Sequence, residues 1–199
     1  MNEEGVIKFN CNWVKAAALP NESIAELNEW RDKLYNQQLI GENNDGIGYG
    51  NISCRYSGDN FVITGSGTGS LKKLGGDHYS KVTAYDFAKN TLTTVGPLKA
   101  SSESLTHAAI YESLADASFV FHIHHPALWK ELMKEGLFTS SEAEYGTPAM
   151  ALEIIRVMKE PLFLKHGIFA MGGHEEGVIA FGKTAAEAGK AIESWLGKL

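Results

Sequence analysis

Glycine is concentrated in one part of this 199-residue chain, because ten of its 21 glycines lie between Gly41 and Gly76. The same part contains two runs rich in β-branched and aromatic residues, Asn51–Tyr56 and Asn60–Thr64, and such runs are typical of β-strands. Glycine adopts backbone conformations that other residues avoid and allows close backbone approach. The sequence therefore predicts short strands joined by tight glycine loops over this part of the chain.

Segments of helical and strand character alternate along the rest of the chain. We predict helices at residues 21–36, 101–115, 126–134, 147–159 and 184–199. We predict further strands at residues 80–87, 91–95, 117–124, 162–166, 168–171 and 178–181. No repeat or linker interrupts this order, so we expect residues 1–199 to form a single α/β domain.

The charge balance argues against a nucleic-acid partner. The chain has 24 acidic and 18 basic residues, a net charge of −6 and no basic run, whereas nucleic-acid-binding surfaces are basic.

The acidic start of the chain, Met1–Glu4, is unlike a signal peptide, and no apolar run of about 18 residues occurs, so we expect no membrane association. Cys11 and Cys54 are far apart, which disfavours a disulfide or a cysteine zinc site. We expect a cytoplasmic protein.

Histidines at the end of a predicted strand form the sharpest chemical signal. Alternation along residues 117–124 places His122 and His124 on one face, about 7 Å apart along the backbone, and the next residue, His125, on the other. Two imidazoles so placed can bind one cation, although two polar side chains at a strand end can equally face solvent. A third histidine, His166, ends another predicted strand. Three neutral imidazoles leave one coordination position open, as catalytic zinc sites require.

A carboxylate and several hydroxyl groups could complete such a site. Glu103 lies at a predicted helix start, where it can act as an acid or simply complement the helix dipole. Ser101 and Ser102 at the same start can cap the helix or bind an anion beside free backbone N–H groups. The loop at residues 63–70 is a second candidate anion site because it alternates glycine with hydroxyl side chains, but it lacks the lysine of a nucleotide-binding P-loop.

The remaining histidines receive no chemical role from the sequence. We expect His78, His107 and His174 to be structural or solvent-exposed. His107 lies one helical turn beyond Glu103, so it could also contact Glu103 and help to orient it without binding the metal itself.

Five blocks of the chain resemble, in their order and spacing, the class II aldolase/adducin family. They are Gly50–Ser53, Thr64–Gly67, Ser101–Glu103, His122–His124 and His166–Gly167. The family includes fuculose-phosphate and rhamnulose-phosphate aldolases, ribulose-phosphate 4-epimerase and methylthioribulose-phosphate dehydratase. The resemblance runs from the first predicted helix to the last. It implies a three-layer αβα sandwich on a mainly antiparallel sheet, assembled as a homotetramer with active sites at subunit interfaces.

The resemblance also implies the residues of the site. A divalent metal, usually Zn²⁺ with Mn²⁺, Co²⁺ or Fe²⁺ as alternatives, would be held by His122, His124 and His166. Glu103 would be the fourth metal ligand or the catalytic acid/base group. The phosphate of a small phosphorylated sugar would be held by Asn51, Ser66, Gly67, Ser101 and Ser102. Such a site supports C–C bond cleavage or formation in a phosphorylated ketose, because a metal stabilises the enediolate and a carboxylate moves the proton.

Further positions leave the exact reaction open. Glu142 falls where the aldolase has a catalytic tyrosine and the epimerase a catalytic aspartate, which favours an epimerase, whereas Glu103 in the metal motif favours an aldolase. We predict a metal-dependent aldolase with Glu103 and Glu142 as catalytic residues. A sugar-phosphate 4-epimerase, a methylthioribulose-phosphate dehydratase and a non-catalytic adducin-like interaction domain are the alternatives. The chain ends at Leu199, before the tail that supplies a neighbouring subunit with a tyrosine in the family's enzymes, and residues 172–177 resemble an insertion without an assigned role.

Overall fold

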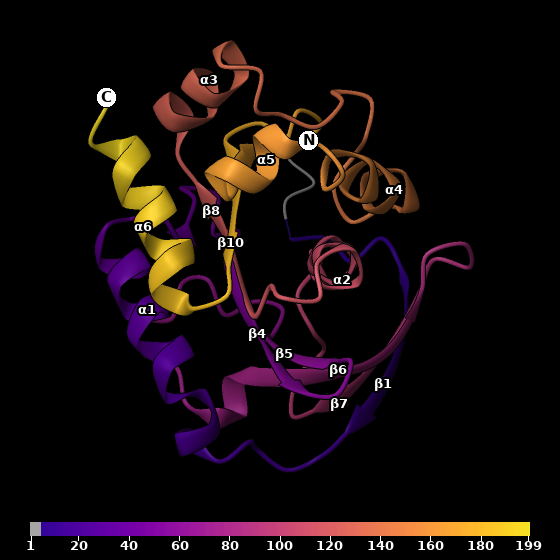
Figure 1. The fold of residues 1–199 in the computed structure, drawn as a ribbon. Coiled ribbons are helices and arrows are strands. Elements are labelled where there is room, and N and C mark those ends of the chain that lie inside the picture. The colour runs from indigo at the N-terminus through magenta and orange to yellow at the C-terminus, as the bar shows by residue number, and fades with distance from the viewer. Residues whose placement is uncertain (1–4) are drawn as a thin grey trace.

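The computed structural model describes residues 5–199, which are organised around one large β-sheet flanked by helices (Figure 1). The acidic start, Met1–Glu4, from which we expect no signal peptide, lies outside the described residues. The strands are β1 (Asn10–Lys15), β2 (Gly41–Glu42), β3 (Gly48–Tyr49), β4 (Asn51–Ser57), β5 (Asn60–Thr64), β6 (Tyr79–Asp86), β7 (Thr91–Gly96), β8 (Phe119–His124), β9 (Ile168–Ala170) and β10 (Gly177–Gly182). The α-helices are α1 (Ala25–Asn36), α2 (Ser104–Ser113), α3 (Pro126–Lys134), α4 (Pro148–Val157), α5 (Pro161–His166) and α6 (Ala185–Leu196), and the 3-10 helices are η1 (Asn21–Ile24) and η2 (Gly76–His78).

The central sheet has eight strands in the order β1-β7-β6-β5-β4-β8-β10-β9, while β2 pairs separately with β3. Neighbouring strands of the sheet are antiparallel apart from β1 and β7, which are parallel. Helices α1 and α6 pack on one face, and α2 packs on the other with α4 against it (Figure 1). The predicted fold class, a three-layer αβα sandwich with a mainly antiparallel sheet, is confirmed.

The glycine-rich part of the chain forms the strands and loops that the sequence predicts. Strands β4 and β5 lie in the middle of the sheet, where Ile52 and Val62 are fully buried. The loop after β5 packs backbone to backbone against the small β2–β3 hairpin. A Cβ on Gly69 would lie 2.6 Å from the carbonyl oxygen of Gly41 and 2.9 Å from the Cα of Gly48. Glycine is therefore required here for close approach, and the contact fixes the loop in place.

Two elements differ from the sequence prediction. Residues 162–166, predicted as a strand, form helix α5, because Pro161 begins the helix and Gly167, at a φ of +62°, ends it in the left-handed conformation. A short apolar run does not by itself distinguish a buried strand from a helix. Strand β1 has no counterpart in the sequence prediction. It pairs with β7, a partner distant in the chain, so no local pattern marks it.

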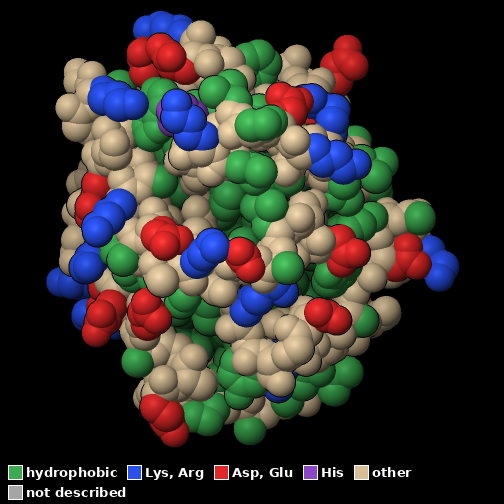
Figure 2. Space-filling view, viewed as in Figure 1, with side chains coloured by type: hydrophobic (Ala, Val, Ile, Leu, Met, Phe, Trp, Pro, Cys, Tyr) green, Lys and Arg blue, Asp and Glu red, His purple; other side chains and the backbone are tan. Residues whose placement is uncertain are grey.

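The surface shows no sign of a single dominant charge on the face that Figure 2 presents, where acidic and basic side chains are interspersed. None of the helices formed by residues 5–199 combines the length and apolar character that a membrane crossing requires. Cys11 and Cys54 are both free thiols.

Candidate active site

Strand β8 presents two histidines on one face of the sheet. His122 and His124 flank Ile123 and alternate with Phe121, whose ring lies 5.9 Å from that of Trp30 on α1, centroid to centroid. The histidines therefore face the opposite side of the sheet, where α2 lies. Their own ring centroids are 5.0 Å apart. His122 is fully buried and His124 is 9% exposed, so neither is a solvent-facing residue at a strand end.

The third histidine brought to this place is His174, for which the sequence predicts no chemical role. One side-chain nitrogen from each of His122, His124 and His174 lies within 4.8 Å of those of the other two. Nε2 of His124 is 3.0 Å from Nε2 of His174, and His174 is only 6% exposed. We refer to these three residues as the histidine cluster.

Two glycines allow His174 to reach the cluster. A Cβ on Gly177 would lie 2.2 Å from Cδ2 of His174 and 3.1 Å from Cε1 of His122. A Cβ on Gly173 would lie 2.0 Å from the carbonyl oxygen of Ala143. No larger residue fits at either position, so residues 172–177 form the tight turn that delivers the third imidazole. A histidine bracketed by glycines is the one local signal in the sequence that points to this role.

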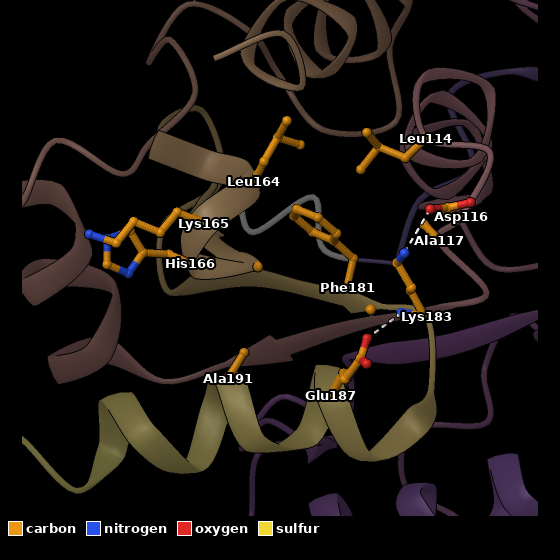
Figure 3. A pocket seen from close by; sticks show the side chains of 12 residues that line it. Leu114, Asp116, Ala117, Leu164, Lys165, His166, Phe181, Lys183, Glu187 and Ala191 are labelled. Atoms are coloured by element: carbon orange, nitrogen blue, oxygen red, sulfur yellow. Dashed lines mark hydrogen bonds and ion pairs between the residues drawn. The ribbon is translucent and has the colours of Figure 1, made fainter. Parts of the chain in front are cut away.

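His166 is not part of the cluster, and the predicted ligand set is corrected accordingly. It ends helix α5 rather than a strand, and its ring packs on Trp195 of α6, with the ring centroids 5.6 Å apart. Helix α6 covers the face of the sheet opposite α2. Figure 3 shows His166 at the edge of a separate hollow of about 440 Å³, lined also by Leu164, Phe181 and Lys183.

Burial keeps the imidazoles of the cluster neutral. It lowers the pKa of His124 to about 4. It also lowers the pKa of His174 to about 3, with smaller contributions from the neighbouring His124 and Lys8. Burial, aided by the adjacent histidines, holds the pKa of His122 well below its usual value. Neutral imidazole is the form that binds a metal ion, so the cluster needs no deprotonation at neutral pH.

The cluster also contains polar atoms that a cation would satisfy. Neither ring nitrogen of His122 has a hydrogen-bond partner of normal geometry among residues 5–199, although the residue is fully buried. An unsatisfied buried polar group costs about 1–3 kcal/mol, so such atoms point to a missing partner. Three convergent imidazoles are the donor set of catalytic zinc sites. The residues present therefore fit a divalent metal ion.

Next to the cluster lies a small polar cavity of about 30 Å³. The five residues predicted to bind phosphate all line it, together with glycines of the same loops: Asn51, Ser66, Gly67, Ser101 and Ser102. We refer to these five residues and the loop at residues 65–69 as the cradle. A Cβ on Gly67, whose φ is +77°, would meet no atom within 4 Å, so this glycine faces open space.

The cradle and the histidine cluster are joined through neighbouring strands. Asn51 on β4 pairs with His122 on β8 in the antiparallel register. Asn51 is 6% exposed, and its Oδ1 has no hydrogen-bond partner among the described residues. One small molecule can therefore contact both places.

The backbone of the cradle offers hydrogen-bond donors. The N–H groups of Gly65 and Ser66 donate to the carbonyls of His78 and Lys99, at 2.8 Å and 2.9 Å. In contrast, the N–H groups of residues 67–70 donate no hydrogen bond of normal geometry to an acceptor within the described part of the chain. Consecutive free amides of this kind form anion-binding concavities without any basic side chain.

The two predicted catalytic carboxylates lie in different environments. Glu103 is 2% exposed at the start of α2, directly after Ser102 of the cradle, and its Oε2 accepts a hydrogen bond of 2.7 Å from Thr106. The structure does not bring its carboxylate into the group formed by the three histidines. Glu142 is exposed, and it precedes Ala143, the residue that packs on the turn carrying His174. Neither Ser101 nor Ser102 is the N-cap of α2, which is Glu103.

Two aromatic side chains pack against the cluster. The Tyr145 ring lies 4.6 Å from that of His174, and the Tyr49 ring lies 5.3 Å from that of His124, measured between centroids. A hollow of about 280 Å³ reaches the cluster between Tyr49, His124 and Glu176. Behind the cluster, His107 is fully buried, and its Nδ1 lies 2.6 Å from the hydroxyl of Ser53, as expected for a structural histidine.

Solved structures with this fold include several aldolases. A putative aldolase/epimerase/decarboxylase, YgbL from Klebsiella pneumoniae, aligns with a TM-score of 0.64 at 18% identity over 87% of this chain and 84% of its own. A sugar-phosphate aldolase from Thermotoga maritima aligns with a TM-score of 0.61 at 17% identity over 87% and 90%. L-fuculose-1-phosphate aldolase from Thermus thermophilus aligns with a TM-score of 0.55 at 21% identity over 86% and 84%.

At these identities the likeness is one of fold. No curated protein matches the sequence itself. The family model of the class II aldolase and adducin N-terminal domain, however, matches residues 35–195, which include the cradle and all three histidines of the cluster. The chain is therefore a member of the class II aldolase and adducin N-terminal domain family.

Proposed function

We propose that this protein is a divalent-metal-dependent aldolase that cleaves or forms a C–C bond in a small phosphorylated ketose. The observation that carries the proposal is the juxtaposition of a neutral three-histidine cluster with an amide-rich polar cavity, joined by the pairing of Asn51 with His122. Family membership and the fold of sugar-phosphate aldolases support it.

The metal, which we take to be Zn²⁺, would be held by His122, His124 and His174. Fe²⁺ suits imidazole ligands as well, and Mn²⁺ and Co²⁺ are further alternatives. A divalent cation there supplies Lewis-acid polarisation of a carbonyl group and stabilises developing negative charge. The burial of the three imidazoles would strengthen that interaction.

The chain's own residues bind the substrate and move the proton. The free amides of residues 67–70, with the side chains of Asn51, Ser66, Ser101 and Ser102, would hold the phosphate. Glu103, which is buried directly after the cradle serines, would transfer a proton at the carbon next to the carbonyl. Glu142 is exposed, so it would act in the site of a neighbouring subunit in a homotetramer. The free Cys11 and Cys54 suit a cytoplasmic protein.

The test is a coupling assay with the purified, Zn²⁺-loaded protein, dihydroxyacetone phosphate and short aldehydes. We expect C–C bond formation, with activity lost in His124→Ala and in Glu103→Gln. The Glu103→Gln variant should retain the metal, because its carboxylate lies outside the histidine group. Failure of the wild-type protein to couple any aldehyde would refute the proposal.

An epimerase on the same scaffold is the second candidate, because one structural neighbour is described as a putative aldolase/epimerase/decarboxylase and Glu142 supplies an exposed acid. Turnover of ribulose phosphates without release of a triose phosphate would favour it. A dehydratase would instead convert methylthioribulose phosphate. A protein that binds no metal under any condition would fit an adducin-like interaction domain, which has no use for three convergent neutral imidazoles.

A further inference from the structure

Helix α1 contacts the cradle loop from behind with two polar side chains. Arg31 is 1% exposed, although it carries a guanidinium group. That group donates hydrogen bonds of 3.1, 3.0 and 3.3 Å to the carbonyls of Thr68, Gly69 and Lys72. One helical turn later, the hydroxyl of Tyr35 donates a hydrogen bond of 3.1 Å to the carbonyl of Ser70.

These contacts determine which way the peptide groups of the loop point. The described chain contains no cis peptide bonds, and in a trans peptide the C=O group and the following N–H group point in opposite directions. Carbonyls turned toward Arg31 therefore turn the N–H groups of Gly69 and Ser70 away from α1. These are two of the four amides that lack an acceptor, and Gly69 lines the cradle.

The guanidinium also brings a positive charge that no carboxylate neutralises at close range. Among residues 5–199, no Asp or Glu oxygen lies within ion-pair distance of Arg31, and the adjacent Asp32 pairs with Lys73 instead. Burial lowers the pKa of Arg31, but arginine remains protonated in proteins. A buried charge is screened less than a surface charge, so an anion on the other side of the loop would experience it.

We propose that Arg31, assisted by Tyr35, is a positioning residue for the cradle. It orients the loop so that its N–H groups face a bound phosphate, and it places a positive charge behind them. This inference rests on the proposed phosphate-binding role of the cradle and extends that role to a helix outside the cavity. It explains how a chain with a net charge of −6 can bind a dianion in a cavity lined by no lysine or arginine.

The experiment measures binding of inorganic phosphate to the full-length protein by calorimetry in the wild type and four variants. Arg31→Lys keeps the charge but loses the planar fork of donors, and Arg31→Met loses both. Tyr35→Phe removes a single hydroxyl and tests the same loop with minimal risk to folding.

Arg55 provides the matched control, in Arg55→Lys. It too donates to three carbonyls, those of Tyr111, Leu114 and Ala117, but these lie at the end of α2 and in the turn that follows, which do not line the cradle. Binding of Co²⁺ to the histidine cluster, followed by its visible spectrum, and the melting temperature are recorded for every variant.

We expect Arg31→Lys to weaken phosphate binding about tenfold, Arg31→Met more, and Tyr35→Phe about threefold, in proportion to the hydrogen bonds and charge removed. Arg55→Lys should lower the melting temperature yet leave the phosphate affinity unchanged, and Co²⁺ binding should persist in all variants. If Arg31 had a purely structural role, Arg31→Lys and Arg55→Lys should lose melting temperature and phosphate affinity to the same extent.

The inference is overturned if the Arg31 and Tyr35 variants bind phosphate as the wild type does, or if Arg55→Lys weakens binding equally. Absence of phosphate binding by the wild type would overturn both this inference and the phosphate-binding role of the cradle. Because no turnover is measured, neither result depends on whether the enzyme proves to be an aldolase.

Discussion

The cradle and the histidine cluster are neighbours in space but differ in how they are built. The cradle uses backbone amides and small side chains. Apart from Asn51 on β4, its residues come from two loops that carry glycine and serine in recognisable patterns. The cluster uses three imidazoles, and His174 reaches His124 from 50 positions further along the chain. The difference teaches that a backbone-built site can be predicted from local pattern, whereas a side-chain-built site depends on which distant turn the fold brings in.

The most decisive way to break this comparison is to remove the proposed third metal ligand. His174→Ala should abolish metal binding and lower activity by at least about 1,000-fold, since metal stabilisation of charge is worth several kcal/mol. The matched variant His166→Ala should keep its metal, because the His166 ring packs on Trp195 outside the cluster. Metal content by elemental analysis decides, and loss of metal in His166→Ala alone would restore the ligand set predicted from the sequence.

The cluster can also be disturbed without touching a histidine. In Gly177→Ala, the added Cβ would meet the rings of His174 and His122, so we expect a 10- to 100-fold loss of metal affinity, roughly the order seen when ligand orientation is disturbed. Gly182→Ala, at the other end of β10, meets Cβ of Glu187 at 2.7 Å and should lose stability without losing metal affinity. Equal metal affinities in the two variants would contradict the role assigned to Gly177.

A substitution in the cradle should weaken substrate binding while leaving the histidine cluster intact. Gly67→Val should raise KM for phosphorylated substrates at least about tenfold, because the side chain would occupy the open space in which we propose that the phosphate binds. Gly136→Val is the control, since Gly136 has a similar φ of +75° and open surroundings. Both variants carry the same backbone strain, so a KM change common to both would show that strain rather than occupancy is responsible.

The smallest expected effect concerns pH. In the metal-free protein, burial gives His124 and His174 folded-state pKa values of about 4 and about 3, below the unfolded value of about 6.5. The unfolded chain then binds more protons, so the free energy of unfolding should fall as pH drops below about 6.5, by up to ~1.4 kcal/mol per pH unit for each histidine. Denaturant titrations in a chelator between pH 7 and 4.5 test this. An unchanged slope in His174→Asn would contradict the assignment.

Much of the fold could be predicted because local patterns agree with it. Thr184 caps α6 by accepting a hydrogen bond of 3.1 Å from the Glu187 amide, and the hairpin between β6 and β7 turns at Asn90, with a φ of +51°. Strand β1 could not be predicted, because its pairing with β7 is a tertiary contact. The prediction of a strand at residues 162–166 was wrong, because the proline and glycine at the ends of this segment suit a short helix equally well.

The sequence by itself determined the family, the glycine loops of the cradle and the alternation that puts His122 and His124 on one face. Each of these follows from spacing over a few residues, where backbone geometry is fixed by the chain itself. Only the tertiary structure decided that His174 completes the cluster, that His166 faces another helix layer, and that Arg31 lies behind the cradle. Those placements depend on long-range packing and on close backbone approaches, which no local pattern encodes.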